Sequence, residues 1–354
     1  FAYLGADFRK EEAQATRYRE ILMGMMAGKV LEDNAWQHGS IEKTGLFGEY
    51  HFGKNSYNFI LSGRLNFNKA TALEATEEYA TLYSDYSVTQ VNPNVSFGAI
   101  KTFSKDVSLG LWLGRAQRSG SIAERYINYF TIGLDPYEML GNPNLNPEIN
   151  NQMDLNLTLD KENTKITANV FVSYLQDYIS SVIRPDLTPK VPMMAAGVRQ
   201  FINIDEAMMT GFELSLNQRL PLNMQTQFAI AYTKGQNTSN DEALPEISPL
   251  DLRFKLLGSF ANNKFFPEIS LRHVAKQNRF ASSYGETETP SFTVVDLSSS
   301  YHFNTIFRLT AGVKNLFDVA YYEHLNRSVR NASQRPIYAV GRNFYATLSI
   351  NLMK

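Results

Sequence analysis

The chain has 354 residues, a formal net charge of −1 from 34 basic and 35 acidic residues, and no cysteine. This length exceeds that of a single β-sandwich, the near-neutral charge gives no argument for a nucleic-acid partner, and the lack of thiols excludes disulfides and thiolate catalysis. No apolar run reaches the roughly 18 residues that a transmembrane helix needs. The 23 Phe and 19 Tyr against 2 Trp are typical of a chain with aromatic belts at two membrane interfaces.

Strict alternation of apolar and polar residues predicts β-strands along most of the chain. In the last segment, 341–352, Phe344, Leu348 and Leu352 fall on one face, and Tyr345 and Ser349 fall on the other, because side chains alternate in direction along a strand. The apolar face runs along the whole strand, so it suits a hydrocarbon exterior as well as a protein core. This segment alone leaves a membrane barrel and a soluble sandwich open.

The same pattern recurs from the first residue to the last and predicts 14 strands. They lie near 1–9, 40–52, 57–67, 91–103, 107–117, 153–159, 166–174, 199–217, 225–233, 252–260, 266–274, 293–301, 307–316 and 341–352. The alternation assigns Phe212 and Met208 to the apolar face and Met209 to the polar face. We therefore expect Met208 to face outward and Met209 to face the interior.

The connections between these strands alternate strictly between long and short, with seven long and six short. Outer-membrane barrels have short periplasmic turns and long extracellular loops, whereas soluble β-proteins have no reason to collect every long loop at one end. The sequence therefore predicts an all-β fold, a transmembrane antiparallel β-barrel in the outer membrane. Tandem soluble sandwiches are the alternative.

The first residues, 1–9, already read as a strand, without an initiator Met or a signal peptide. A natural domain rarely starts in the middle of such a pattern. We therefore expect residues 1–354 to be the C-terminal part of a single barrel within a longer protein.

Three short segments resemble one known family. Positions 141–148 read Gly-Asn-Pro-Asn-Leu-Asn-Pro-Glu, positions 315–318 read Asn-Leu-Phe-Asp and are followed by Tyr321 to Arg327, and positions 341–344 read Gly-Arg-Asn-Phe. In this order they resemble the TonB-dependent outer-membrane receptors. One departure is the C-terminal sequence Leu352-Met353-Lys354, where that family usually ends in an aromatic residue.

The resemblance implies a barrel of 22 strands around an N-terminal plug, of which about 14 strands lie in this chain. The plug, the first strands and the segment that contacts the TonB energy-transducing complex are then absent from it. The implied function is active import across the outer membrane, with surrounding lipid and a small metal-containing substrate as partners.

No arrangement of residues predicts an enzyme. The five histidines are scattered, so none forms a short-spaced metal-binding pair with another. No Gly-x-Ser-x-Gly sequence is present to expose a nucleophilic serine. We expect a protein that is not an enzyme and has no intrinsic cofactor, with copper or a ferric chelate as cargo.

Methionine is the residue type with unusual placement. Met23, Met25 and Met26 fall in the first long loop, and further methionines in later loops or strands are Met139, Met193, Met194 and Met209. Thioether sulfur is a soft ligand that suits Cu(I). Methionine also fills gaps in packed loops, so packing is the competing interpretation.

Two further features bear on the substrate. Positions 244–250, together with 323–327 and thus His324, resemble the copper-receptor branch of the family, although related stretches occur in its siderophore and cobalamin branches. Arg327, Arg330 and Arg335 cluster near the last loop, where they would attract an anionic siderophore; a solvated rim is the simpler interpretation. We expect a copper receptor, with a ferric-siderophore, haem or cobalamin receptor as the alternative, and a passive porin or adhesion barrel as the alternative of another class.

Overall fold

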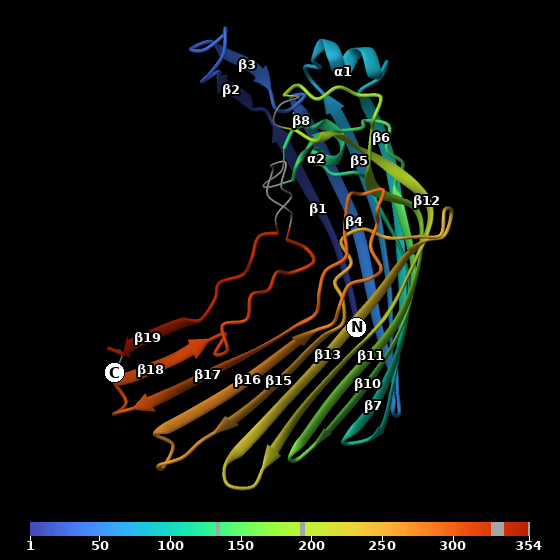
Figure 1. The fold of residues 1–354 in the computed structure, drawn as a ribbon. Coiled ribbons are helices and arrows are strands. Elements are labelled where there is room, and N and C mark those ends of the chain that lie inside the picture. Colours follow the sequence, from blue (N-terminus) through green and yellow to red (C-terminus); the bar gives the residue numbers. More distant parts are fainter. Residues whose placement is uncertain (132–134, 192–194, 327–335, 353–354) are drawn as a thin grey trace.

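The computed structural model describes residues 1–131, 135–191, 195–326 and 336–352. Most of these residues lie in strands of one large curved sheet (Figure 1). In the described ranges, no helix is both long enough and apolar enough to cross a membrane.

The described residues contain two short helices and nineteen strands. The helices are α1 (Glu77–Leu82) and α2 (Ile122–Tyr126). The strands are β1 (Ala2–Ala13), β2 (Thr16–Glu20), β3 (Val30–Asn34), β4 (Gly39–Lys54), β5 (Tyr57–Ala72), β6 (Ser87–Ser104), β7 (Val107–Arg118), β8 (Asn128–Phe130), β9 (Tyr137–Leu140), β10 (Glu148–Lys161), β11 (Thr164–Ile183), β12 (Gly197–Leu220), β13 (Met224–Asn237), β14 (Glu242–Ala243), β15 (Asp251–Gly258), β16 (Phe265–Val274), β17 (Phe292–His302), β18 (Phe307–Lys314) and β19 (Asn343–Ile350).

Fourteen of the strands described form the wall of the barrel, each pairing antiparallel with the next along the chain. They are β1, β4, β5, β6, β7, β10, β11, β12, β13, β15, β16, β17, β18 and β19. Their number and order confirm the prediction of an antiparallel barrel wall. The short strands β2, β3, β8, β9 and β14 lie in the long connections, where the sequence predicted only loops.

The connections separate by length between the two ends of the wall (Figure 1). Tight turns such as 55–56 and 105–106 lie at one end, and both helices and the β2–β3 hairpin lie at the other. Several tight turns use the left-handed conformation that asparagine tolerates, with φ of 55° at Asn55 and 60° at Asn263. Local turn chemistry therefore sets the pattern of connections.

The two faces of the wall have the predicted polarity. Leu309 lies opposite Leu348 in the register of β18 and β19, and Thr310 lies opposite Thr347 on the other face. On β12, Met208 is exposed on the outer face, whereas Met209 packs against a buried cluster with Leu175. The alternation in the sequence therefore identifies which side chains face lipid.

Several strands extend further than predicted, and β11 by the most. β11 continues to Ile183, although the sequence predicted a loop from residue 178. In this extension Ile179, Ser180 and Ser181 are all buried. Neighbouring loops cover both faces of the strand. Polar and apolar residues therefore do not alternate here, because alternation requires one face in water and one in an apolar environment.

The Asn-Leu-Phe-Asp segment ties the end of β18 to the start of β19. Asn315 takes the left-handed conformation, accepts a hydrogen bond from the Val319 N–H (2.9 Å) and donates one to the Val319 carbonyl (2.9 Å). Asp318 accepts a bond from the Arg342 N–H (2.7 Å). These bonds explain why the two motifs occur together: they fix where the last strand begins.

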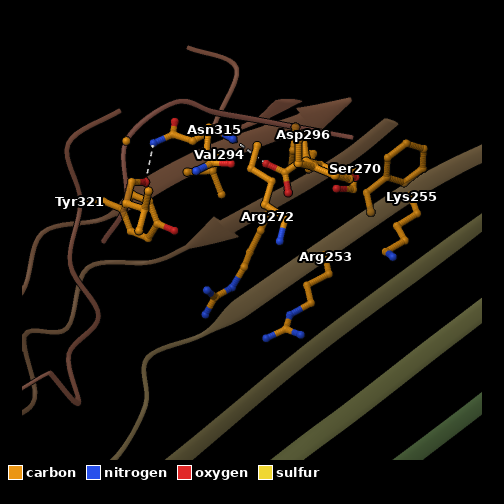
Figure 2. A pocket seen from close by; sticks show the side chains of 15 residues that line it. Arg253, Lys255, Ser270, Arg272, Val294, Asp296, Asn315 and Tyr321 are labelled. Carbon is orange, nitrogen blue, oxygen red and sulfur yellow. Dashed lines mark hydrogen bonds between the residues drawn. The ribbon is translucent and has the colours of Figure 1, made fainter. Parts of the chain in front are cut away.

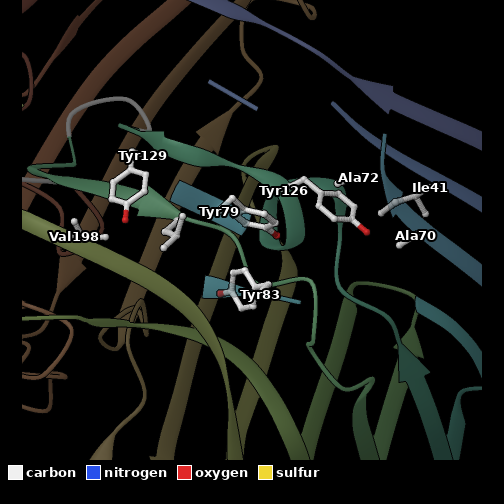
Figure 3. Packing of buried hydrophobic residues seen from close by; sticks show 9 residues of the cluster. Ile41, Ala70, Ala72, Tyr79, Tyr83, Tyr126, Tyr129 and Val198 are labelled. Carbon is white, nitrogen blue, oxygen red and sulfur yellow. The ribbon is translucent and has the colours of Figure 1, made fainter. Parts of the chain in front are cut away.

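Buried side chains gather at the long-loop end of the wall in a cluster that we call the loop core (Figure 3). It consists of Ile41, Ala70, Ala72, Tyr79, Tyr83, Tyr126, Tyr129, Leu140 and Val198. Burial raises the pKa of Tyr83 to about 12, although its hydroxyl still donates a hydrogen bond to the Gly141 carbonyl (3.1 Å). Several long loops thus share one packed interior.

Arg125 anchors the 141–148 segment to this core. Its fully buried guanidinium donates to the carbonyls of Pro143 and Leu145, the latter at 3.0 Å, and to the Gln90 side chain at 2.8 Å. A Cβ atom at Gly141 would lie 2.3 Å from the Arg125 carbonyl oxygen, which only glycine avoids. The motif is therefore a brace within the packed loops.

Candidate functional site

The β2–β3 hairpin stands apart from the loop core and carries the methionine cluster (Figure 1). At its base, Arg17 donates to Asp33 (3.0 Å) and to the Tyr129 carbonyl (2.9 Å), so the hairpin is fixed to the loop that contains β8. Arg19 also lies 3.1 Å from Asp33, and these arginines lower the pKa of Asp33 although burial opposes the shift. Ion pairs of Arg17 and Arg19 with Asp33 therefore hold the base of the hairpin.

The tip of the hairpin exposes three thioethers. Met23 is 85% exposed, Met25 is fully exposed and Met26 is 49% exposed. The turn is ordered by backbone bonds, among them Gly28 N–H to the Ile21 carbonyl at 2.7 Å. Soft sulfur ligands are thus presented to solvent on a turn of defined backbone.

The other predicted methionines are not part of this tip. Met139 lies in β9 and is 4% exposed, beside Arg199 in the parallel pairing of β9 with β12. Met209 packs with Leu175, Ala207 and Leu244 on the inner side of β12. Met193 and Met194 lie outside the described residues.

His324 lies in a buried network, with its side chain 2% exposed. Its Nδ1 is 2.9 Å from the Thr289 hydroxyl, and its Nε2 is 3.7 Å from Glu286. Burial alone would raise the pKa of Glu286, but His324 and the N–H groups of Ala281 and Glu246 outweigh it and lower that pKa. The structure therefore places His324 where it joins three loops.

No cluster of three or more His, Cys, Asp or Glu side chains suited to a metal occurs in the part of the chain that the structure describes. Arg327, Arg330 and Arg335 lie outside that part. Within it, the methionine tip is the candidate for metal capture, and a different region must be considered for an anion.

That region is a hollow of about 900 Å³ on the inner wall, formed by β15–β19 and the segments beside them (Figure 2). Arg253, Lys255, Arg272 and Lys314 line it. Arg253 and Arg272 are directly opposite in the register, an arrangement that like charges alone would destabilise. Asp251 lies 3.0 Å from Arg253 and 2.8 Å from Arg272, and so offsets this repulsion.

The sequence analysis did not single out this basic wall, although a signal was available. Arg253 and Lys255 alternate with the outward residues Leu252, Phe254 and Leu256, which places both cations on the interior face. What the sequence does not reveal is the register that brings Arg272 opposite Arg253.

Comparisons with known proteins agree with the fold. The family model described as TonB dependent receptor-like, beta-barrel, matches residues 1–316. None of the curated protein sequences compared with the chain matches it.

Solved structures share the architecture at low sequence identity. The copper transporter OprC is 24% identical with a TM-score of 0.81, over 99% of this chain and 54% of that one. The ferric-catecholate import receptor Fiu from E. coli is 13% identical with a TM-score of 0.69, over 99% and 51%. The FrpB iron transporter from Neisseria meningitidis is 15% identical with a TM-score of 0.64, over 88% and 46%. The chain thus spans about half the length of these proteins.

Proposed function

We propose that this chain, which belongs to the TonB-dependent receptor family, is the barrel wall of an outer-membrane importer that takes up copper. Members of the family are transporters and not enzymes. The plug and the segment that contacts TonB would be supplied by sequence outside this chain. One of the structural relatives is a copper transporter, and two others take part in iron import.

The exposed thioethers of Met23, Met25 and Met26 carry the choice of copper. Large apolar side chains cost free energy when exposed to water, so three on one turn need a reason other than packing. Cu(I) prefers soft thioether ligands, whereas Fe(III) needs hard oxygen donors. In this proposal the tip captures Cu(I), and Met209, on the inner side of β12, is a later station.

The test is Cu(I) binding by the full-length receptor in detergent. We expect the variant with Met23→Leu, Met25→Leu and Met26→Leu to lose most of the bound Cu(I), because leucine keeps the apolar volume and removes sulfur. The control is Met208→Leu, which changes a lipid-facing methionine. Equal copper content in the triple variant and the wild type would reject the tip as the capture site.

Uptake measurements test the transport class. Copper accumulation in cells that make the receptor should require TonB, since an importer depends on energy from the inner membrane. A passive porin or adhesion barrel would give accumulation that is independent of TonB, or none.

The basic inner wall favours a second candidate, import of an anionic ferric chelate. Arg253 and Lys255 of β15 and Lys314 of β18 line the same hollow of the inner wall, and clustered cations raise the local concentration of an anionic ligand. The discriminating variant is Arg253→Gln with Lys255→Gln. If that variant takes up less ferric chelate than the wild type, and the methionine variant takes up as much ferric chelate as the wild type, the assigned cargo would be the chelate and not copper.

A further inference from the structure

One row of side chains on the outer face of the wall is not explained by transport. Lys54, Tyr57 and Lys101 are direct neighbours in the register of β4, β5 and β6. Residues paired across strands point to the same side of a sheet, and this row continues the outward face that carries Phe52 and Phe59. Two lysines therefore flank a tyrosine on the surface that faces lipid.

The position of the row fixes its depth in the bilayer. Lys54 is the last residue of β4 and Tyr57 the first of β5, so the row lies at the tight-turn end of the wall. In outer-membrane barrels the short turns are periplasmic, and aromatic residues mark both interfaces. The row is therefore level with the headgroups of the periplasmic leaflet.

Lys101 is held in place by aromatic rings. Its Nζ donates to the Tyr57 hydroxyl (2.7 Å) and lies 4.7 Å from the centre of the Tyr57 ring and 5.1 Å from that of Phe103. Such contacts position an ammonium without neutralising it. The ammonium group therefore remains available to an external anion.

Neither lysine is neutralised by a carboxylate. Within the described residues no acidic side chain lies within ion-pair distance of Lys54 or Lys101, whereas Lys165, at the same end of the wall, lies 3.2 Å from Asp160. Unpaired cations at this depth match the phosphate groups of a phospholipid layer.

The rings next to the row offer a surface for acyl chains. Phe59 stacks on Phe52 with ring centres 5.0 Å apart, and on Tyr57 and Phe97 at 6.1 Å each. Stacked rings present a smooth apolar face towards the bilayer centre. A ligand with a phosphate at one end and hydrocarbon at the other fits the whole patch.

We propose that Lys54, Tyr57 and Lys101 bind the phosphate of a phospholipid in the periplasmic leaflet, with its acyl chains on the adjoining rings. The two lysines stand on strands two positions apart in the sheet, a distance of roughly 10 Å between backbones. Two extended lysine side chains can close on one phosphate over Tyr57. The site is independent of the cargo and of the methionine tip.

The test measures lipid retained by the full-length receptor in a neutral detergent. Dioleoylphosphatidylglycerol is added, and retained lipid is counted by native mass spectrometry for the wild type and for Lys54→Gln with Lys101→Gln. Each lysine should contribute about fivefold and the pair about 25-fold to retention. The control, Lys165→Gln, removes a lysine at the same end that faces the interior and is paired with Asp160, and should retain lipid as the wild type does.

Two further arms identify what is recognised. Dioleoylglycerol, which has the chains without the phosphate, should not be retained, and inorganic phosphate at the concentration of the lipid should not displace it. Folding of each variant is checked by heat modifiability on gels. Wild-type retention in the folded double variant, retention of dioleoylglycerol, or displacement by inorganic phosphate would each overturn the proposal.

Discussion

The loop core and the β2–β3 hairpin lie at the same end of the wall, yet their side chains differ in exposure to solvent. Tyr79 and Tyr126 are fully buried in the loop core, whereas Met23 and Met25 of the hairpin are almost fully exposed. Arg17 joins the two regions through the Tyr129 carbonyl. A rigid base therefore carries an open tip.

This contrast distinguishes residues that pack in the loops from residues that are available to bind a ligand. The 141–148 segment, which carries part of the family resemblance, is braced by Arg125, and its Leu145 is 1% exposed. The exposed side chains of the hairpin tip do not pack into the loop core, so they are free to bind a ligand. Binding residues are often found on loops that a rigid scaffold holds in place. Stability measurements should therefore respond strongly to changes in the core and weakly to changes at the tip.

The largest effect is expected from Arg125→Ala. The change leaves the Pro143 carbonyl without its donor, removes one of the two donors to the Leu145 carbonyl and opens a cavity, which should lower the free energy of unfolding by about 3–4 kcal/mol. Urea unfolding of the folded receptor measures it. Arg9→Ala, at a side chain that is 71% exposed, is the control and should change stability by less than about 0.5 kcal/mol. Equal effects would mean that Arg125 does not brace the loops.

The second-largest loss of stability is expected from a substitution in the barrel wall, which supports both regions. Leu348→Arg places a charge on the lipid-facing side of β19 and should cost about 2–4 kcal/mol if the residue lies near the bilayer centre. Ser349→Arg, on the interior face, should be tolerated. Heat modifiability and urea unfolding in lipid vesicles measure the difference. Similar damage from both changes would contradict the register of β19.

A smaller, pH-dependent effect is expected from Glu124 at the edge of the loop core. Its carboxylate accepts bonds from Arg118 (2.8 Å) and the Ser121 N–H (2.6 Å). Burial would raise the pKa of Glu124, but these donors outweigh it and hold the pKa below its usual 4.5. The stability that ionised Glu124 contributes is therefore present above pH 4.5 and is lost as pH falls through the lower pKa of the folded state.

Glu124→Gln tests this sign. At pH 7 the variant should be less stable than the wild type by about 1–2 kcal/mol, and the gap should close as the pH is lowered below 4.5, measured by urea unfolding at each pH. A gap that widens on acidification would contradict the assigned direction.

The sequence predicted the wall well because strand alternation is a local property. Each residue such as Leu309 or Thr310 is assigned to a face by its neighbours alone, and the lipid outside gives every strand the same rule. The number of wall strands and the order of long and short connections followed from it. The prediction failed in β11 beyond residue 178, where loops cover both faces and the alternation ends.

The candidate site was predictable only in part. The cluster of Met23, Met25 and Met26 is visible in the sequence because its members are adjacent, and their exposure now distinguishes them from Met139. The role of Arg125 was not predictable, since Pro143 and Leu145 lie 18 and 20 positions away in a segment without periodicity, and Gln90 lies 35 positions away in β6. Contacts between irregular segments leave no local pattern.

The smallest effect on stability is expected at the hairpin tip. The variant with Met23→Leu, Met25→Leu and Met26→Leu should unfold within about 0.5 kcal/mol of the wild type without metal, because exposed side chains make few contacts to lose. Adding Cu(I) should then stabilise the wild type and not the variant, since only a ligand bound to the folded state raises the free energy of unfolding. Urea unfolding with and without Cu(I) measures both quantities. Met139→Leu, a buried change of the same chemistry, should keep the response to Cu(I) while changing stability more. If the triple variant were strongly destabilised without metal, the tip would belong with the packed loops and the contrast between the two regions would fail.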